Sequence, residues 1–593
     1  MTSLLLLLTP LWPLLLALPL VLRLLQSEPA ASQQAFNALW LSAPLPALLL
    51  ALYLGSGLFE TAANSSQQLL LPGLLLGGHW LVDEVRLVFL LMTSLLWLLA
   101  GIYARGYMQG KPAALNAFAL LWLLTQSGNL LLILAEDVAS FYLGFALMTF
   151  AGYGLVIHQR TSEALQAGRI YLVLAVLGEA LMLAGLLGTT ARSATPTMSQ
   201  LAITLAEPDA PLWLLTCLLL GFGVKAGLPF LHVWLPLAHP VAPTPASAVL
   251  SGAMIKAGLL GWWLVLPLGL TSLPQTGHLL TTAGLLAALA AALIGIMQSR
   301  AKSVLAYSSI SQMGMITALL GAGLADQHLW PLLVPALLLF VAHHGLNKGS
   351  LFLAVGISQH PGRLPLPLLV LLLLLPALAL TGLLGSGLMT KWEAKSGLYQ
   401  LEYTGLINWL TLAAAGTTLL MARYLWLLWQ EYKTASQPDQ HQSNPWMLTG
   451  WLILLPLGLL VPWWLPLPDQ AQLLWPDPQN FLQLALPVML GSLLALAGGW
   501  LIGRFSKDWQ SRAIPGGDLV WIYLSLQQPL QHLGQKLLSA LQQAQQQVLQ
   551  LAHSLSLIWP LLLRLTDRES LLRREAALTF ALLLVVLAGL LLL

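Results

Sequence analysis

Long apolar stretches separated by short polar segments recur along almost the whole chain. The core of a bilayer, about 30 Å thick, is crossed by about 20 consecutive apolar residues in a helix. Stretches that approach this length fall at about 4–25, 37–58, 80–103, 115–134, 138–158, 169–188, 212–235, 244–268, 278–297, 303–324, 330–356, 365–389, 403–429, 447–465, 481–503 and 575–593. The pattern predicts an all-α polytopic membrane protein with about sixteen transmembrane helices and no soluble domain.

The segment from 518 to about 565 has a different pattern, in which glutamines alternate with leucines. Its apolar residues recur at helical three and four spacing, at Leu526, Leu530, Leu533, Leu537, Leu541, Val548, Leu551 and Leu555. Such a stripe predicts an amphipathic helix. At 1.5 Å per residue the helix would be about 70 Å long, too long to cross a bilayer. We expect this lateral helix to lie along the lipid interface or, given its length, against partner subunits.

Composition supports a membrane protein and excludes several other classes. The 593 residues are 58% hydrophobic and 8% charged, whereas about a quarter of residues are charged in soluble domains. The net charge of +3 forms no basic patch, so we predict no nucleic-acid partner. The single cysteine, Cys217, excludes an internal disulfide, and the twelve histidines show no metal-ligand spacing. No phosphate-binding loop, dinucleotide motif or nucleophile–base set is recognisable, so we expect neither cofactor, metal nor catalysis by this chain itself.

The loop charges predict an orientation, because Lys and Arg accumulate in cytoplasmic loops. The basic loop residues fall almost entirely in odd-numbered loops, at Arg23, Arg105, Lys111, Arg160, Arg169, Arg300, Lys302, Arg363, Lys433, Arg504, Lys507 and Arg512. The even-numbered loops are mostly acidic, with Arg192 as the main exception. We therefore expect both termini outside the cytoplasm, in a bacterial inner membrane.

Five lysines lie inside the predicted spans or at their ends: Lys225, Lys256, Lys348, Lys391 and Lys395. A lysine facing lipid at the bilayer centre costs about 3 kcal/mol, so five would cost roughly 15 kcal/mol, comparable with the stability of a whole domain. Most of them must therefore be paired or solvated. Lys225 is followed by a Gly-Pro break at 227–229, and helix breaks at membrane depth are tolerated where they line a cavity. We interpret this segment as part of an ion path.

Other titratable residues in the spans complete a candidate proton relay. Glu179 lies in the sixth span, and His344 and Lys348, four residues apart, share one helix face in the eleventh. Burial disfavours the charged form of lysine and a nearby carboxylate favours it, so moving the partner can load or unload a proton. Glu179 could instead be a structural partner of a lysine, and His344 and Lys348 could stabilise a kink.

Three further residues are candidates for the mouths of the path. His239 lies beside a predicted cytoplasmic loop, where it could pass protons or fix the loop. Glu136 and Asp137 lie between the fourth and fifth spans, at the expected outer mouth. Lys395, with Glu393, lies near a helix end and is expected to extend to an interface.

Four segments of the chain resemble the antiporter-like family of proton-conducting subunits. The matching words are GVKAGLPFLHVWLPLAHPVAPTPASA at 223–248, LSGAMIKAG at 250–258, SVLAYSSISQMG at 303–314 and HGLNKGSLFL at 344–353. The family includes large membrane subunits of respiratory complex I, of hydrogenase-4 and formate hydrogenlyase, and of Mrp-type cation/proton antiporters. The resemblance covers about residues 80 to 430, and the C-terminal pattern is similar to the lateral helix and last span of the largest complex I member.

This resemblance implies two inverted five-helix repeats, near 115–268 and 278–429, each with a broken helix that carries a lysine. Lys225 and Lys391 would be symmetry partners, with Lys256, His344 and Lys348 on the axis between them. The implied parts are N-terminal helices at 1–110, a first repeat at 111–270, a second repeat at 271–430, additional helices at 431–510, a lateral helix at 511–570 and a terminal helix at 571–593.

The chain departs from the family pattern at one position. Family members generally carry a glutamate in the fifth span that pairs with the first lysine, and here Ala146 stands in its place. Either Glu179 has taken over that role, or Lys225 lacks its usual partner and transport is altered.

The resemblance favours a proton-translocating subunit of a multi-subunit respiratory, hydrogenase-type or related energy-coupling complex, such as one for inorganic-carbon uptake. Its partners would be other membrane subunits and protons, with redox or other chemistry on a partner. The alternatives are an Mrp-type subunit that exchanges Na⁺ or K⁺ for H⁺, and a structural scaffold with a defunct channel.

Overall fold

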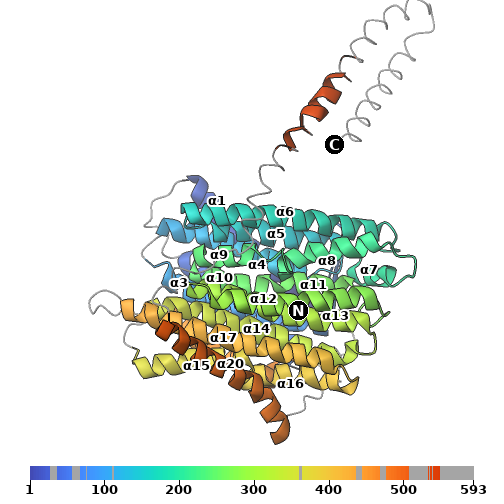
Figure 1. Ribbon diagram of the computed structural model, residues 1–593. Coiled ribbons are helices and arrows are strands. Elements are labelled where there is room, and N and C mark those ends of the chain that lie inside the picture. The colour runs from blue at the N-terminus through green and yellow to red at the C-terminus, as the bar shows by residue number, and fades with distance from the viewer. Residues whose placement is uncertain are drawn as a thin grey trace, which may run out of the picture. The chain divides into compact units, whose positions relative to one another are not determined.

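The computed structural model describes residues 1–26, 36–56, 67–74, 77–109, 112–359, 364–435, 444–467 and 476–505, and parts of 532–550. The chain separates into two compact units, Met1–Asp518 and Leu519–Leu593. Within the first unit the long helices run side by side (Figure 1). In the second, the described residues between 532 and 547 are helical and mostly exposed.

The first unit begins with α1 (Thr2–Gln26), a 3₁₀ turn η2 (Phe36–Ser42) and α2 (Leu45–Gly55), followed by strands β1 (Gln67–Leu71) and β2 (Gly78–Val82). The next helices are α3 (Glu84–Tyr107), α4 (Pro112–Leu134), α5 (Val138–Val156), α6 (Ser162–Thr190), α7 (Met198–Leu205), α8 (Leu212–Ala226), α9 (Trp234–Val241), α10 (Thr244–Val249), the π-helix η3 (Leu250–Met254) and α11 (Lys256–Val265). The second part contains α12 (Pro274–Ile296), α13 (Ala301–Ala325), α14 (Trp330–Gln359), α15 (Leu366–Thr381), α16 (Gly385–Gln400), α17 (Thr404–Ala435), α18 (Pro445–Leu459), α19 (Val461–Trp464) and α20 (Pro478–Phe505).

The described residues contain twelve helices long and apolar enough to cross a membrane, and three shorter apolar helices at 39–55, 212–226 and 445–459. Each of the first fifteen predicted stretches overlaps one of these fifteen helices. The sixteenth stretch, and most of the predicted lateral helix at 518–565, lie outside the described residues. The polytopic helical class is therefore confirmed, whereas the count of sixteen stays a prediction.

A short antiparallel hairpin precedes α3, where the sequence pattern predicts a span from residue 80. Strands β1 and β2 pair with Gln67 opposite Val82 and Leu71 opposite Gly78. Asp83 explains why the helix begins only after the strand, since its side chain accepts a hydrogen bond of 2.7 Å from the Arg86 backbone N–H. Such an N-cap satisfies an otherwise unpaired donor of the first turn.

Two helices of the membrane unit are interrupted at glycine. The α8 helix ends at Gly227, with φ of 85°, and α15 ends at Gly382, with φ of 92°. Glycine adopts this left-handed conformation without a Cβ clash, and it therefore ends helices readily. The break after Lys225 was predicted. The span predicted to end at 389 instead breaks at 382–384 and continues as α16 to Gln400, so Lys391 and Lys395 lie within a helix.

The path of the chain through 244–265 contains a third irregularity. Between α10 and α11 the π-helix η3 is closed by a hydrogen bond of 3.2 Å from the Ile255 N–H to the Leu250 carbonyl, five residues earlier. It lies against α14, which is buried along most of its length beside the equally buried α13. These elements form the centre of the membrane unit.

Candidate functional site

Lys225 lies in the last turn of α8 and is almost fully buried, with 4% of its surface exposed. Its Nζ donates hydrogen bonds to Thr149 Oγ1 at 3.2 Å and to Tyr171 Oη at 3.1 Å. The rings of Phe145, Tyr171 and Trp234 lie with their centroids 5.3–5.9 Å from the same nitrogen. Aromatic faces attract a cation at such distances, so the site can hold a charged lysine without a directly paired carboxylate.

Glu179 on α6 lines the same cavity as Lys225 and is exposed by only 4%. The two side chains interact electrostatically, and the Thr149 hydroxyl also interacts with the Glu179 carboxylate. Among the ion pairs that the described residues form, none joins them directly. The cavity offers about 10 Å³ to the centre of a water molecule, on the order of what one ordered water needs. The cavity therefore has room for about one water molecule beside the two side chains.

Small residues bring Glu179 and Lys225 together. Gly178 precedes Glu179, and Gly221 lies one turn before Lys225. A Cβ on Gly221 would lie 2.6 Å from the Met182 backbone nitrogen, and a Cβ on Gly178 would lie 2.9 Å from Val224 Cβ. Both glycines therefore allow α6 and α8 to approach at backbone distance, which places the carboxylate and the ammonium on facing surfaces.

The next two lysines each donate to a backbone carbonyl. Lys256 Nζ lies 2.8 Å from the carbonyl oxygen of Ser251 in the π-helix, and Lys348 Nζ lies 3.0 Å from the carbonyl oxygen of Leu305. Both side chains are at most 1% exposed. An ammonium has three donors, so a single carbonyl partner leaves capacity for water or a neighbouring group.

Histidines connect these lysines to the second half of the bundle. His344 interacts electrostatically with Lys256 and Lys348, and His343 with Lys256 and Lys391. Neither ring nitrogen of His344 has a hydrogen-bond partner among the described residues, whereas His343 Nδ1 lies 2.7 Å from Ser386 Oγ at the start of α16. An imidazole both accepts and donates a proton through its two nitrogens, so this pair can act between lysines.

His239 lies inside the protein and has no exposed surface. Its ring stacks on Phe352 with a centroid separation of 4.5 Å and interacts electrostatically with Lys348 and with Lys302 at the start of α13. Neither ring nitrogen has a hydrogen-bond partner in the described part of the chain. His239 therefore lies between Lys302, at the N-terminus of α13, and Lys348 on α14.

Lys391 lies on α16, after the second helix break, and its side chain extends back to the end of α15. Its Nζ donates a hydrogen bond of 2.6 Å to the carbonyl of Thr381, the last residue of α15. Lys225 likewise lies in the last turn of α8. The C-terminal end of a helix carries partial negative charge, which favours a charged Lys391 at the last carbonyl of α15 and a charged Lys225 in the last turn of α8. Lys395 differs from expectation, because it is only 7% exposed and lines a cavity with Lys391 instead of extending to an interface.

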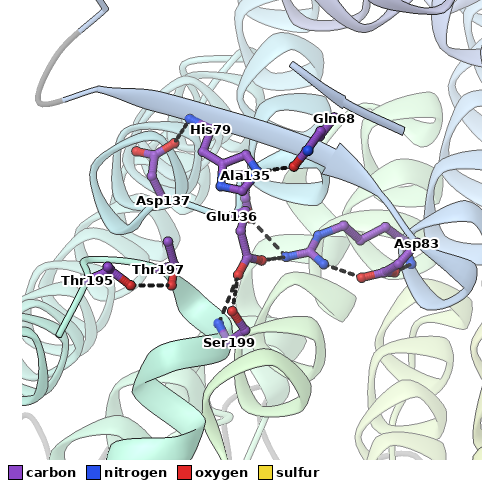
Figure 2. Close-up of polar contacts among 10 residues, drawn as sticks. Gln68, His79, Asp83, Ala135, Glu136, Asp137, Thr195, Thr197 and Ser199 are labelled. Atoms are coloured by element: carbon purple, nitrogen blue, oxygen red, sulfur yellow. Dashed lines mark hydrogen bonds and ion pairs between the residues drawn. The ribbon is translucent and has the colours of Figure 1, made fainter. Parts of the chain in front are cut away.

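Glu136 and Asp137 are buried in a polar network between α4 and α5 (Figure 2). Glu136 accepts hydrogen bonds from Arg86 Nη2 at 2.5 Å and from the N–H and hydroxyl of Ser199 at 3.0 and 2.5 Å. Asp137 caps α5 through the Ser140 N–H and also accepts from the backbone N–H of His79 in β2. The network joins the hairpin, α3, α5 and α7, which gives it a structural role.

Arg86→Met is expected to destabilise the protein by about 3–5 kcal/mol, because it leaves the buried Glu136 carboxylate without its cation. The matched control is Arg192→Met, which removes an exposed ion pair with Asp209 and should cost no more than about 1 kcal/mol. Thermal unfolding of the two purified variants measures the difference. Equal melting temperatures for both variants would contradict a structural role of the Arg86 pair.

Several residues of this site were not predicted from the sequence. Thr149 and Tyr171, the hydrogen-bond partners of Lys225, come from α5 and α6 and carry no motif of their own. The sequence places His343 directly before His344, but only His344 was among the predicted site residues, and Ser386 was not identified. Two adjacent histidines in a span could have indicated both contacts, because successive residues of a helix point to different sides and so reach different neighbours.

A broken-helix membrane fold with a row of buried lysines defines the class of this protein. Residues 135–383 match the family model described as NADH:quinone oxidoreductase/Mrp antiporter, TM. This part of the chain is similar to antiporter-like membrane subunits of hydrogenases, Mrp complexes and NADH:quinone oxidoreductase, and the resemblance of its motifs to this family is confirmed.

Known proteins similar to this chain are subunits of that kind. It is 29% identical to hydrogenase-4 component B of Escherichia coli (strain K12), over 46% of this chain and 42% of that protein. It is 28% identical to the putative antiporter subunit mnhA2 of Staphylococcus saprophyticus, over 64% and 52%. The chain thus spans about half the length of the curated relatives it matches. The Mrp complex of Dietzia sp. DQ12-45-1b shares the fold, with a TM-score of 0.68 at 20% identity, over 99% of this chain and 63% of that one.

Proposed function

We propose that this chain is a proton-translocating subunit of a multi-subunit energy-coupling complex. Protons would move along Glu179, Lys225, Lys256, His344, Lys348 and Lys391, with His239 or the pair Glu136 and Asp137 near the mouths. The observation that carries the proposal is the cavity shared by Glu179 and Lys225, which holds an acid and a base without a direct ion pair. A locked ion pair would hold its proton, whereas separated partners can exchange it.

The geometry supports a stepwise mechanism in the first half of the path. When Lys225 is charged, the Thr149 and Tyr171 hydroxyls and the aromatic rings stabilise it. A proton passes between Lys225 and Glu179 through the Thr149 hydroxyl or one water in the cavity. A shift of α6 against α8 changes the distance between Glu179 and Lys225. A short distance favours the charged forms of both groups and a long distance favours their neutral forms, so the shift changes which of the two holds the proton.

The second half of the path would work through electrostatic coupling. Lys256 and Lys348 repel each other across His344, so charging one favours deprotonation of the other. His343 would then pass the proton towards Lys391, since it interacts with Lys391 and contacts Ser386 on α16. The carbonyl partners of these lysines accept hydrogen bonds from either charge state and hold the side chains in place.

The arrangement of repeats, termini and partners is part of the same proposal. The repeats would span 111–270 and 271–430, with both termini outside the cytoplasm of a bacterial inner membrane. Redox or other chemistry would lie on partner subunits, contacted in part through the lateral helix at 518–565. The relatives are named as components of hydrogenase-4 and of a putative antiporter, which supports a multi-subunit setting.

Proton movement into vesicles that contain the chain with its co-purified subunits tests the proposal. We expect flux that is driven by the complex or by an imposed proton gradient and that does not depend on Na⁺ or K⁺. The similarity to the antiporter subunit mnhA2 favours a second candidate, an Mrp-type Na⁺(K⁺)/H⁺ antiporter. That candidate predicts proton movement only when Na⁺ or K⁺ is added. No flux under either condition would contradict both.

A further inference from the structure

A second cavity of the membrane unit surrounds Lys391 and Lys395. Five helices contribute to its wall, α13, α14, α16, α17 and α20. Apart from the two lysines the lining is apolar, and it includes Phe340, Leu410 and Leu484. The cavity leaves a volume of about 30 Å³ to the centres of water molecules, which exceeds the roughly 10–15 Å³ that one water requires. There is room for a small ligand beside the lysines.

The two lysines face this cavity from consecutive turns of α16. Residues four apart lie on one helix face, and both side chains line the wall. Lys391 uses one donor on the Thr381 carbonyl, and Lys395 Nζ makes no hydrogen bond among those of the described residues. The lysines repel each other electrostatically. Several N–H donors therefore remain without an acceptor in an apolar chamber.

The charges of the two lysine cavities differ. The first cavity contains one lysine and one carboxylate, Lys225 and Glu179. The second contains two lysines, and no aspartate or glutamate is among the described residues that line it. Glu393 lies between the two lysines in sequence, but at 100° per residue it projects nearly opposite to both. The second cavity lacks the negative charge that the first one has.

We propose that a small monovalent anion of about the size of chloride binds between Lys391 and Lys395. An anion between two ammonium groups replaces their repulsion by two attractions, which are strong in surroundings of low polarity. It also accepts the hydrogen bonds that the two side chains have left to give. The cavity is apolar elsewhere, which excludes anions that require many polar partners. The site shares Lys391 with the proposed proton path, but anion binding does not depend on proton transfer.

Binding of ³⁶Cl⁻ to the purified complex in chloride-free gluconate buffer tests the proposal. We expect saturable binding for the natural protein. Lys395→Met should raise the dissociation constant roughly tenfold or more, as expected for a lost hydrogen bond to a charged group. Lys395→Arg keeps the charge and should retain binding. Lys225→Met should leave binding unchanged, because Lys225 lies in the other cavity.

Ala414→Leu provides a second route that keeps both lysines. Ala414 lines the cavity from α17 and is 3% exposed, so a larger side chain there fills the space. We expect it to abolish ³⁶Cl⁻ binding. Absence of saturable binding by the natural protein, or equal affinity of Lys395→Met and the natural protein, would overturn the proposal. Proton flux measured on the same preparations separates this outcome from a failure of the proposed transport function, because Lys225→Met should lose flux and keep the anion.

Discussion

Replacing Glu179 with glutamine is expected to reduce proton flux in reconstituted vesicles by roughly 100-fold or more, as for loss of a positioned proton-transfer group. The amide keeps the size of the side chain but cannot accept a proton from Lys225. The cavity that both residues line contains no other carboxylate among its described residues. Flux is measured with a pH-sensitive dye trapped inside the vesicles, and unchanged flux would show that Glu179 is only a structural neighbour.

Two further variants make this experiment specific. Glu207→Gln changes an exposed acid in the segment between α7 and α8 and should leave flux intact. Ala146→Glu, added to Glu179→Gln, introduces a glutamate one turn before Thr149 on α5, where family members generally carry one. We expect the double variant to recover part of the flux, because Thr149 shows that this face of α5 reaches Lys225. Recovery would demonstrate that the two positions serve one role.

Lys348→Arg is the second change with a large expected effect. Arginine can still donate to the Leu305 carbonyl, as Lys348 does at 3.0 Å, but it does not lose its proton in proteins. A structural role would therefore survive the change, whereas a relay role would not. We expect folded protein with flux reduced by about 100-fold or more.

Lys433→Arg is the matched control, because this lysine lies exposed near the end of α17, beside Trp429. It should transport at the natural rate. Size-exclusion profiles of both variants report folding separately from flux. If Lys348→Arg is folded and transports normally, the central lysine acts as a fixed hydrogen-bond donor, and the path must pass elsewhere.

Most of the membrane fold could be predicted from apolar length alone, because a span needs little more than about 20 apolar residues. The irregular parts were less visible. The break at Gly227 was predicted from the glycine and a nearby proline, whereas the break at Gly382 lies in a mostly apolar segment without a proline beside it, and its position was not predicted. Strand β2 was missed because His79 and Trp80 directly precede an apolar run, and only the Asp83 cap separates strand from helix.

The candidate site was predicted in its charges but not in its contacts. Lysines inside apolar spans can be identified from the sequence, because few side chains have so high a free energy of transfer into lipid. They do not identify hydroxyl partners such as Tyr171, which approach from another helix. The expectation that Lys395 extends to an interface was also wrong. The span was predicted to end at 389, but this residue lies inside α16, the second of two half-helices, so Lys395 is not beyond a helix end. It is buried because α13, α14, α17 and α20 enclose the cavity that it lines.

The π-helix before Lys256 sets the rotational phase of everything that follows it in α11. Five-residue closure at Leu250–Met254 inserts one residue relative to an α-helix, and one residue corresponds to a rotation of about 100°. Lys256 and Trp262 therefore lie on sides that a helical wheel counted from Thr244 assigns incorrectly. Sequence comparisons across this segment will align a relative without the bulge one residue out of register, and its lysine will then appear to point away from His344 and Lys348.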